Sequence, residues 1–276
     1  MRFLGFLVVA AALAVPPFVL PAHRTSELAT AGAYFVAIVG LDVLARESRR
    51  VSLGQSAFMA IGAYTTAILV AHRGTGEALA VALAAVVAGC AGIAVSLVGA
   101  RALAPVTLAL ALALPGILAR LEGADGIAFA KVPQPYAVTW TVAGALFLVA
   151  WAFVASPAGR SLRAVRDSEL AAVASGLNRS VWRALAVAFS AAYAGVAGAL
   201  LALAAGHVGP ETFPFALSLT LLAGAAVGLL GSIWGALAGA LLVELLSAGL
   251  RPGPAAFVLG AVLVAAVLAG RSVRRL

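Results

Sequence analysis

Charged residues are scarce in this sequence. They make up 10% of its 276 residues, whereas a soluble globular domain carries about 25%. Hydrophobic residues make up 64%, and the mean hydropathy is +1.11. A chain with so little charge does not have the composition of a soluble domain.

Residues that carry chemistry in many enzymes are also scarce. Cys90 is the single cysteine, so no disulfide forms within the chain, and we expect it to be a small packing residue. The three histidines, His23, His72 and His207, are not spaced as metal ligands. Lys131 is the single lysine, and its surroundings, FAKVPQP, are not a phosphate-binding G-x-x-x-x-G-K-[ST] loop. The sequence therefore gives no support for a membrane-embedded enzyme, a metal site or ATP hydrolysis within this chain.

Long apolar runs are abundant instead. Runs of about eighteen or more apolar residues are typical of transmembrane helices, whereas the strands of a membrane β-barrel alternate in polarity. The sequence predicts an all-α, polytopic transmembrane helical bundle that forms a single domain over residues 1–276. We expect about ten spans (8–10), because several runs barely reach the length that crosses a bilayer. The expected spans lie near residues 3–20, 28–45, 53–71, 78–100, 102–119, 136–155, 184–204, 214–231, 235–250 and 255–270.

The positions of the arginines predict the orientation of the chain. With both termini cytoplasmic, thirteen of the eighteen Lys and Arg residues fall in cytoplasmic segments and five in external ones, as the positive-inside rule requires. The formal charge of +8 therefore indicates membrane topology and not nucleic-acid binding. The first run, MRFLGFLVVAAALAVPPFVL, is interpreted as an uncleaved span. A cleavable signal peptide is the alternative, and the charge count is the same in both cases.

One long charged segment interrupts the apolar runs. AGRSLRAVRDSELAAVASGLNRSVWR, residues 158–183, holds five arginines and falls on the cytoplasmic side. Pro157 and Gly159 are expected to break the helix of the preceding span. The region 156–183 is either an ordinary solvated loop whose arginines set the topology, or a docking site for a cytoplasmic partner.

A short helix is predicted within this charged segment. Asp167 or Ser168 can cap the sequence ELAAVAS, and Gly176 suits the position after its end. A helix of this length is marginal in water, so it needs a surface to pack on. Apolar residues at helical spacing predict its contact face; they are Leu170, Val173 and Leu177.

Four segments, in chain order, carry a resemblance to one family. VSLGQSAFMAIGAYTTAIL, from Val51, resembles a stretch that reads SLG, a polar residue, then GIGAY. EGADGIAF, from Glu122, resembles an external Gly-rich turn, and SELAAVASGLN resembles a cytoplasmic pattern of Glu-Ala-Ala, three residues, Gly. HVGPETFPFALSLTLLAGAAVGLLGSIWGALAGA, from His207, resembles a Pro-acid-x-Phe loop followed by GS-x-x-G. Together they resemble branched-chain amino acid permeases of ABC transporters, of the LivM type, over roughly residues 30–250.

The resemblance implies a transport mechanism that needs other polypeptides. ATP and Mg²⁺ would be bound by two ABC ATPase subunits, so this chain would hold no cofactor and would not itself be an enzyme. It would form the path for branched-chain or other small hydrophobic amino acids together with a second, LivH-like permease. An extracytoplasmic solute-binding protein would deliver the solute. The resemblance places the chain among the lipids of the bacterial cytoplasmic (inner) membrane, as a multi-pass subunit.

The resemblance also assigns candidate residues for coupling to the ATPases. Ala171, Ala172 and Gly176 match the cytoplasmic pattern in spacing, and Glu169 lies one position early. Arg163 and Arg166 either pair with acidic groups of the ATPase or serve only to set topology.

A second group of candidates belongs to the substrate path. Ser52, Gly54 and Gln55 open the third span, where they predict either an irregular helix start that lines a cavity or a helix cap made by Ser52. Thr65, Thr66 and Thr220 either contact the solute or hydrogen-bond within their own helices; of these we favour Thr66 and Thr220 for the path.

Some positions depart from the family pattern and leave the identity of the solute open, and separately there is one alternative function. RESRR stands ahead of SLGQ where the family has a small-residue turn of the GYAG kind, Thr220 stands where a Glu is frequent, and Ala236 replaces a Pro. The alternative is an ion-coupled secondary transporter of a small solute, whose candidate buried acids would be Asp42 and Glu244.

Overall fold

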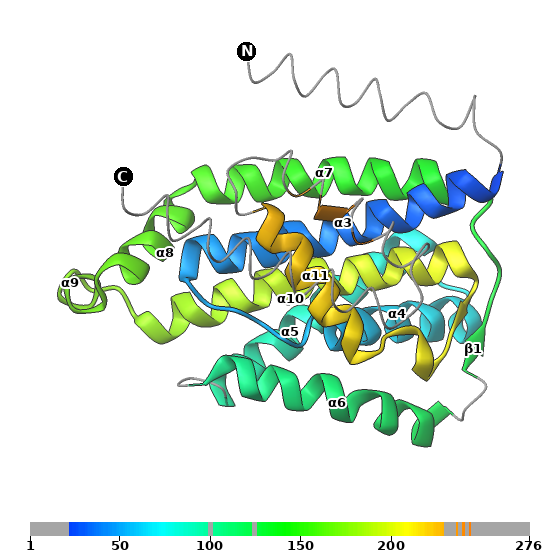
Figure 1. Ribbon diagram of the computed structural model, residues 1–276, viewed down its shortest axis with the longest axis horizontal. Coiled ribbons are helices and arrows are strands. Elements are labelled where there is room, and N and C mark those ends of the chain that lie inside the picture. Colours follow the sequence, from blue (N-terminus) through cyan, green and yellow to red (C-terminus); the bar gives the residue numbers. More distant parts are fainter. Residues whose placement is uncertain are drawn as a thin grey trace, which may run out of the picture.

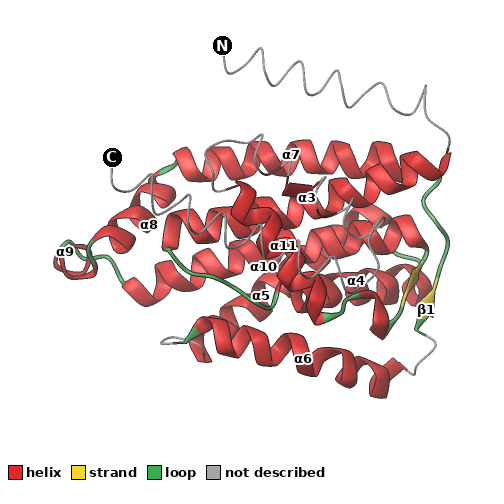
Figure 2. Cartoon of the chain, in the orientation of Figure 1, coloured by secondary structure: helices red, strands yellow, loops and turns green. Residues whose placement is uncertain are grey.

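The computed structural model describes residues 22–98, 102–122 and 126–228, together with Ala236, Gly239, Ala240 and Val243. Helices make up most of the described chain (Figure 2). The long helices are α3 (Ala22–Ser48), α4 (Gln55–Arg73), α5 (Glu77–Val98), α6 (Leu103–Glu122), α7 (Pro135–Ala155) and α10 (Arg179–Ala205). The shorter elements are α8 (Pro157–Asp167), α9 (Glu169–Ala174), α11 (Phe215–Gly228), the 3-10 helix η1 (Pro210–Thr212), and the strands β1 (Ile127–Ala128) and β2 (His207–Val208).

Helix α10 is the centre of the bundle. It packs along α3, α4 and α5, while α3 also packs against α7 and α11 (Figure 1). More than half of the α10 residues are buried, and most of these are Ala, Gly, Val or Leu. An apolar helix that is buried on most of its faces belongs to the interior of a large bundle or to a membrane domain.

Small residues bring α10 close to its neighbours. A Cβ at Gly62 of α4 would overlap the backbone of Gly195, and a Cβ at Gly198 would overlap the backbone carbonyl of Met59. Gly92 of α5 similarly lies against Ala191. In a membrane the hydrophobic effect does not drive helices together, because lipid tails are as apolar as the helices. Close contacts of this kind let helices associate through van der Waals attraction instead.

Two loops distant in the chain meet at one end of the bundle. β1 pairs antiparallel with β2, with Ile127 opposite Val208, and the pair lies at the end opposite α9 (Figure 1). Gly126 has a φ of +69°, and a Cβ there would overlap the Val208 carbonyl. Glycine is therefore required at this turn for both its conformation and its size.

The predicted helical membrane fold agrees with the described helices. All seven expected spans between residues 28 and 231 coincide with helices α3 to α7, α10 and α11, with ends shifted by a few residues. Four described helices are long and apolar enough to cross a membrane: Thr25–Ser48, Glu77–Val98, Pro135–Ala155 and Arg179–Ala205. The spans expected near residues 3–20 and 255–270, and most of 235–250, lie outside the described residues. The total of about ten spans and the cytoplasmic termini stay predictions.

Candidate functional site

The charged segment after α7 is helical and not an open loop. Helix α7 ends at Ala155, as predicted, and Ser156 then caps α8. The Ser156 Oγ accepts hydrogen bonds from the backbone N–H groups of Ala158 and Gly159, at 3.1 and 3.4 Å. Pro157 occupies the first turn of α8, where its missing N–H would have had no helical partner. The helix over residues 157–167 was not predicted, because proline disfavours helix interiors but suits this first position.

The predicted short helix is present as α9. The Ser168 Oγ accepts a hydrogen bond from the Ala171 N–H at 3.3 Å, so Ser168 caps the helix and Asp167 belongs to α8. Gly176 has a φ of +83°. The Leu177 N–H donates to the Ala172 carbonyl at 2.9 Å, which closes the helix end around this left-handed glycine. Both ends of α9 are thus fixed by local sequence.

Part of the predicted contact face of α9 is open to solvent. Leu170 is 87% exposed and Val173 is 53% exposed, whereas Ala172 on the inner side is 3% exposed. Helix α9 lies at one end of the molecule, beyond the ends of the long helices (Figure 1). Two adjacent exposed aliphatic side chains on a six-residue helix form a small apolar contact surface.

Glu169 connects the start of α9 to the start of α10. Its carboxylate forms ion pairs with Arg179, at 3.2 Å, and with Arg183. The Asn178 Oδ1 caps α10 by accepting from the N–H groups of Ser180 and Val181. Helix α9 is therefore held at its base while its outer face stays exposed.

Arg163 and Arg166 contact other parts of this chain. The Arg163 Nη1 lies 2.8 Å from the Glu47 Oε2 and 3.1 Å from the Val154 carbonyl oxygen. Arg166 donates to Asp167 at 2.8 Å and to the Arg46 carbonyl at 2.7 Å. The hydrogen bond to Arg166 lowers the pKa of Asp167, and its counterpart raises the pKa of Arg166. These contacts join α8 to the end of α3.

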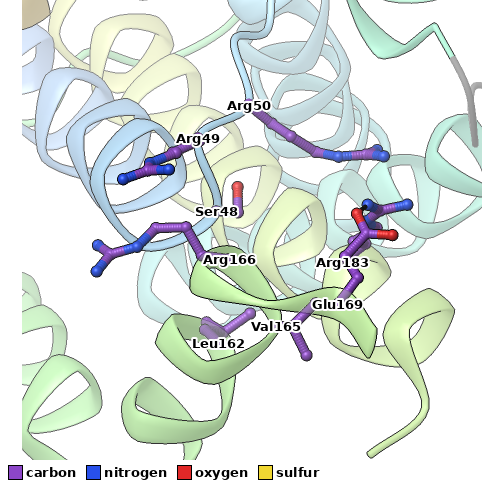
Figure 3. Close-up of a pocket in the computed structure, with 8 residues that line it drawn as sticks. All are labelled: Ser48, Arg49, Arg50, Leu162, Val165, Arg166, Glu169 and Arg183. Atoms are coloured by element: carbon purple, nitrogen blue, oxygen red, sulfur yellow. Dashed lines mark ion pairs between the residues drawn. The ribbon is translucent and has the colours of Figure 1, made fainter. Parts of the chain in front are cut away.

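A pocket of about 230 Å³ lies between α3, α8, α9 and α10 (Figure 3). Its lining consists of Ser48, Arg49, Arg50, Leu162, Val165, Arg166, Glu169 and Arg183. Arg49 has a φ of +52°, a conformation that few residues other than glycine adopt, and its N–H closes the end of α3 on the Ala45 carbonyl at 3.1 Å.

The start of α4 is a second polar site, buried within the bundle. After α3 the chain runs back into the bundle before α4 begins (Figure 1). Gln55 is fully buried, and its Nε2 donates to the Ala37 carbonyl of α3 at 3.2 Å. Its Oε1 has no hydrogen-bond partner. Ser52 accepts from the Gly54 N–H at 3.3 Å, while Gly54, the N-cap residue of α4, makes no side-chain cap. Ser52 thus accepts one backbone N–H just ahead of the helix, and the cavity that the other interpretation places here stays a prediction.

Two hydroxyl groups from distant helices complete this helix start, and the sequence did not reveal them. Ser218 of α11 accepts a hydrogen bond from the Ser56 N–H at 2.9 Å and donates to the Ser56 Oγ at 2.7 Å. Thr107 of α6 accepts from the Leu53 N–H at 3.0 Å. Ser218 and Thr107 each lie in an otherwise apolar run. A hydroxyl group in such a run is the one feature of the sequence that could have pointed to them.

The threonine candidates bond within their own helices. The hydroxyls of Thr65, Thr66 and Thr220 donate to the carbonyls of Ile61, Gly62 and Leu217, at 2.7, 3.0 and 2.8 Å. Threonines in membrane helices commonly form such bonds. Assignment of Thr66 and Thr220 to a substrate path therefore stays a prediction.

The comparison with known families decides the classification. Residues 25–268 match the family described as "Branched-chain amino acid transport system / permease component". The chain belongs to this permease family. The match covers all the described helices from α4 onward and nearly all of α3.

Two individual relatives of this permease carry names that agree with the family. It is 30% identical over 289 residues to the high-affinity branched-chain amino acid transport system permease protein LivM of Escherichia coli (strain K12), and the alignment covers 86% of this chain. It is 29% identical over 259 residues to the protein of the same name from Salmonella typhimurium, over 76% of this chain. The alignments span 66% and 59% of those two relatives. No solved structure matches the chain.

The family segments of the permease occupy its two ends and its centre. The SLGQ stretch ends at the first residue of α4, EGADGIAF contains β1, the charged segment forms α8, α9 and the start of α10, and the segment from His207 includes β2, η1 and α11. Asp42 forms an ion pair with Arg46 one helical turn away, at 2.7 Å. Glu244 lies outside the described residues. Among the described residues, no three His, Cys, Asp or Glu side chains are placed to hold a metal ion.

Proposed function

We propose that this chain is a permease subunit of an ABC importer. With a second, LivH-like permease it would form the transmembrane path for branched-chain or other small hydrophobic amino acids. Two separate ATPase subunits would bind and hydrolyse ATP with Mg²⁺, and an extracytoplasmic solute-binding protein would deliver the solute. Family membership and the names of the two relatives support this proposal.

The observation that carries the proposal is α9. This helix is capped at both ends, is held at its base by Glu169, and presents Leu170 and Val173 outward. A helix that places an apolar face into the groove of a partner is a common recognition mode. An ATPase subunit that binds this face could displace α9 when ATP binding closes the ATPase pair.

Displacement of α9 would reach the spans through ion pairs. Glu169 connects α9 to α10, and Arg163 and Arg166 connect α8 to the end of α3. Ala171 and Ala172 leave room for close packing, and Gly176 ends the helix. We therefore assign Arg163 and Arg166 a role in transmitting movement within the chain, in addition to their effect on topology.

The substrate path would include the start of α4. Buried polar groups at a broken helix start supply hydrogen bonds in an otherwise apolar membrane site. The Gln55 Oε1 is an acceptor suited to the amino group of a solute, once α3, α6 and α11 separate from it. Ser52, Gly54, Thr66 and Thr220 complete the proposed path, and the apolar surroundings suit an aliphatic side chain.

The proposed setting is the bacterial cytoplasmic (inner) membrane. The chain would cross it about ten times, with both termini and the α8–α9 end in the cytoplasm, as the excess of arginine at that end supports. The β1–β2 end would face the binding protein.

Gly176→Pro tests the coupling role. Proline cannot adopt a φ of +83° and removes the N–H that donates to the Val173 carbonyl at 3.0 Å. In proteoliposomes containing the two ATPases, the second permease and the binding protein, we expect this variant to lose ATP-driven leucine uptake while its amount in the membrane is unchanged. Gly74→Pro is the matched control, because Gly74 is also a left-handed glycine that closes a helix in open space, at φ +59° after α4. It should retain most uptake.

Two results would contradict the proposal. Normal uptake by Gly176→Pro would remove the coupling role of α9. Uptake of leucine on an ion gradient with no ATPase present would exclude an ABC importer and favour the secondary transporter.

A further inference from the structure

We propose that the pocket between α3, α8, α9 and α10 binds a phosphate group. We call it the arginine pocket and define it by Arg49, Arg50, Arg166 and Arg183, with Glu169 at its edge and Leu162 and Val165 below. In Figure 3, Arg50 reaches from the end of α3 toward Arg183, which pairs with Glu169. This proposal goes beyond transport and does not depend on it.

The charge balance at this end of the bundle supports an external anion. Residues 42–50 and 156–183 hold eight arginines and four carboxylates. All four carboxylates are already ion-paired within the chain: Asp42 with Arg46, Glu47 with Arg163, Asp167 with Arg166, and Glu169 with Arg179 and Arg183. The two segments together therefore carry a net charge of +4, eight positive charges less four negative ones. An anion from outside the chain would reduce the repulsion between the arginines.

Burial increases this repulsion at Arg50. Desolvation lowers the pKa of the Arg50 guanidinium, and the positive charge of Arg183 lowers it further. Two guanidinium groups held near each other in a partly buried site favour a ligand with several negatively charged oxygens, because each planar group can donate two parallel hydrogen bonds to a phosphate.

Two of the arginines that line the pocket, Arg49 and Arg50, follow directly after α3. A volume of about 230 Å³ is several times the ~30 Å³ that one water molecule occupies in the liquid, so a phosphate with part of an attached ester fits. The pocket lies where α3 ends and α10 begins, and the ends of membrane helices meet the headgroups of anionic lipids.

The experiment measures phosphate binding by the purified full-length chain. In detergent, inorganic phosphate is added and the unfolding temperature is followed, with chloride at equal ionic strength as the reference. Separately, the chain is reconstituted with phosphatidylcholine and phosphatidylglycerol, and co-purified lipid is counted by native mass spectrometry. Whichever of the two probes binds, inorganic phosphate or phosphatidylglycerol, Arg50→Gln should weaken its binding about tenfold. This is the loss expected for one charge-assisted hydrogen bond.

Two further variants distinguish binding in the arginine pocket from attraction by the general positive charge of this end of the molecule. Arg160→Gln removes an equal charge from the exposed face of α8, outside the pocket, and should leave binding unchanged. Arg50→Lys keeps the positive charge but lacks the planar guanidinium group, so it should bind phosphate severalfold more weakly than wild type. It replaces Arg50→Gln in the experiment if that variant does not fold.

Each outcome decides the proposal. A rise in unfolding temperature with inorganic phosphate, lost in Arg50→Gln, identifies free phosphate as the ligand. Retention of phosphatidylglycerol without that rise identifies a lipid headgroup. If neither probe binds, or if Arg160→Gln weakens binding as much as Arg50→Gln, the proposal is wrong.

Discussion

At the residue scale, several described glycines of the bundle lie directly against backbone atoms of a neighbouring helix. Gly198 of α10 lies against the Met59 carbonyl of α4, and Gly62 of α4 lies against Gly195. Backbone atoms cannot move aside as a flexible side chain can, so an added methyl group would have to separate the helices.

Gly198→Ala should therefore destabilise the chain by about 1–3 kcal/mol, the usual range for overpacking. The matched variant is Gly144→Ala in α7, where an added Cβ meets nothing within 4 Å; it should be neutral or stabilise by up to about 1 kcal/mol because alanine favours helix. Thermal unfolding in detergent measures both. Equal effects of the two variants would show that the α4–α10 contact is not tight.

At the element scale, the start of α4 depends on hydroxyls from other helices. Thr107→Val removes the acceptor of the part-buried Leu53 N–H and leaves that donor unsatisfied, which should cost about 1 kcal/mol. Thr141→Val is the control, because the exposed Thr141 hydroxyl only donates to the Ala137 carbonyl of its own helix; its effect should be small. A similar loss of unfolding free energy in both variants would contradict this account.

Local signals in the sequence predicted the long helices, α11 and α9, but neither α8 nor the partners of each helix. Ser168 and Gly176 define α9 by capping rules that act over a few residues, and the apolar runs gave seven helices within a few residues of their ends. The pairing of Ser56 with Ser218, 162 residues apart, follows from how α4 and α11 pack, which no local pattern encodes. Arg166 was found as a candidate, but its bond to the Arg46 carbonyl depends in the same way on the packing of α8 against α3.

At the scale of the whole molecule, the two ends of the bundle should face opposite sides of the membrane. In a Cys90→Ala background, we expect a membrane-impermeant maleimide added outside intact cells to label Glu211→Cys in η1 and not Ala174→Cys in α9. Both positions are exposed, and the arginine excess predicts that α9 lies inside. Labelling of both after permeabilisation is the control. External labelling of Ala174→Cys would overturn the orientation.

The two ends of the molecule are also held by different forces. The β1–β2 end is joined by backbone hydrogen bonds between strands, whereas the α8–α9 end is joined largely by partly exposed ion pairs. Dissolved salt screens charges over about 8 Å at physiological ionic strength but acts little on backbone hydrogen bonds. A rise in potassium chloride should therefore speed amide hydrogen exchange in α9 and leave Ile127 and Val208 unchanged. Changes in salt concentration would therefore loosen the α8–α9 end of this permease and leave the β1–β2 end in place.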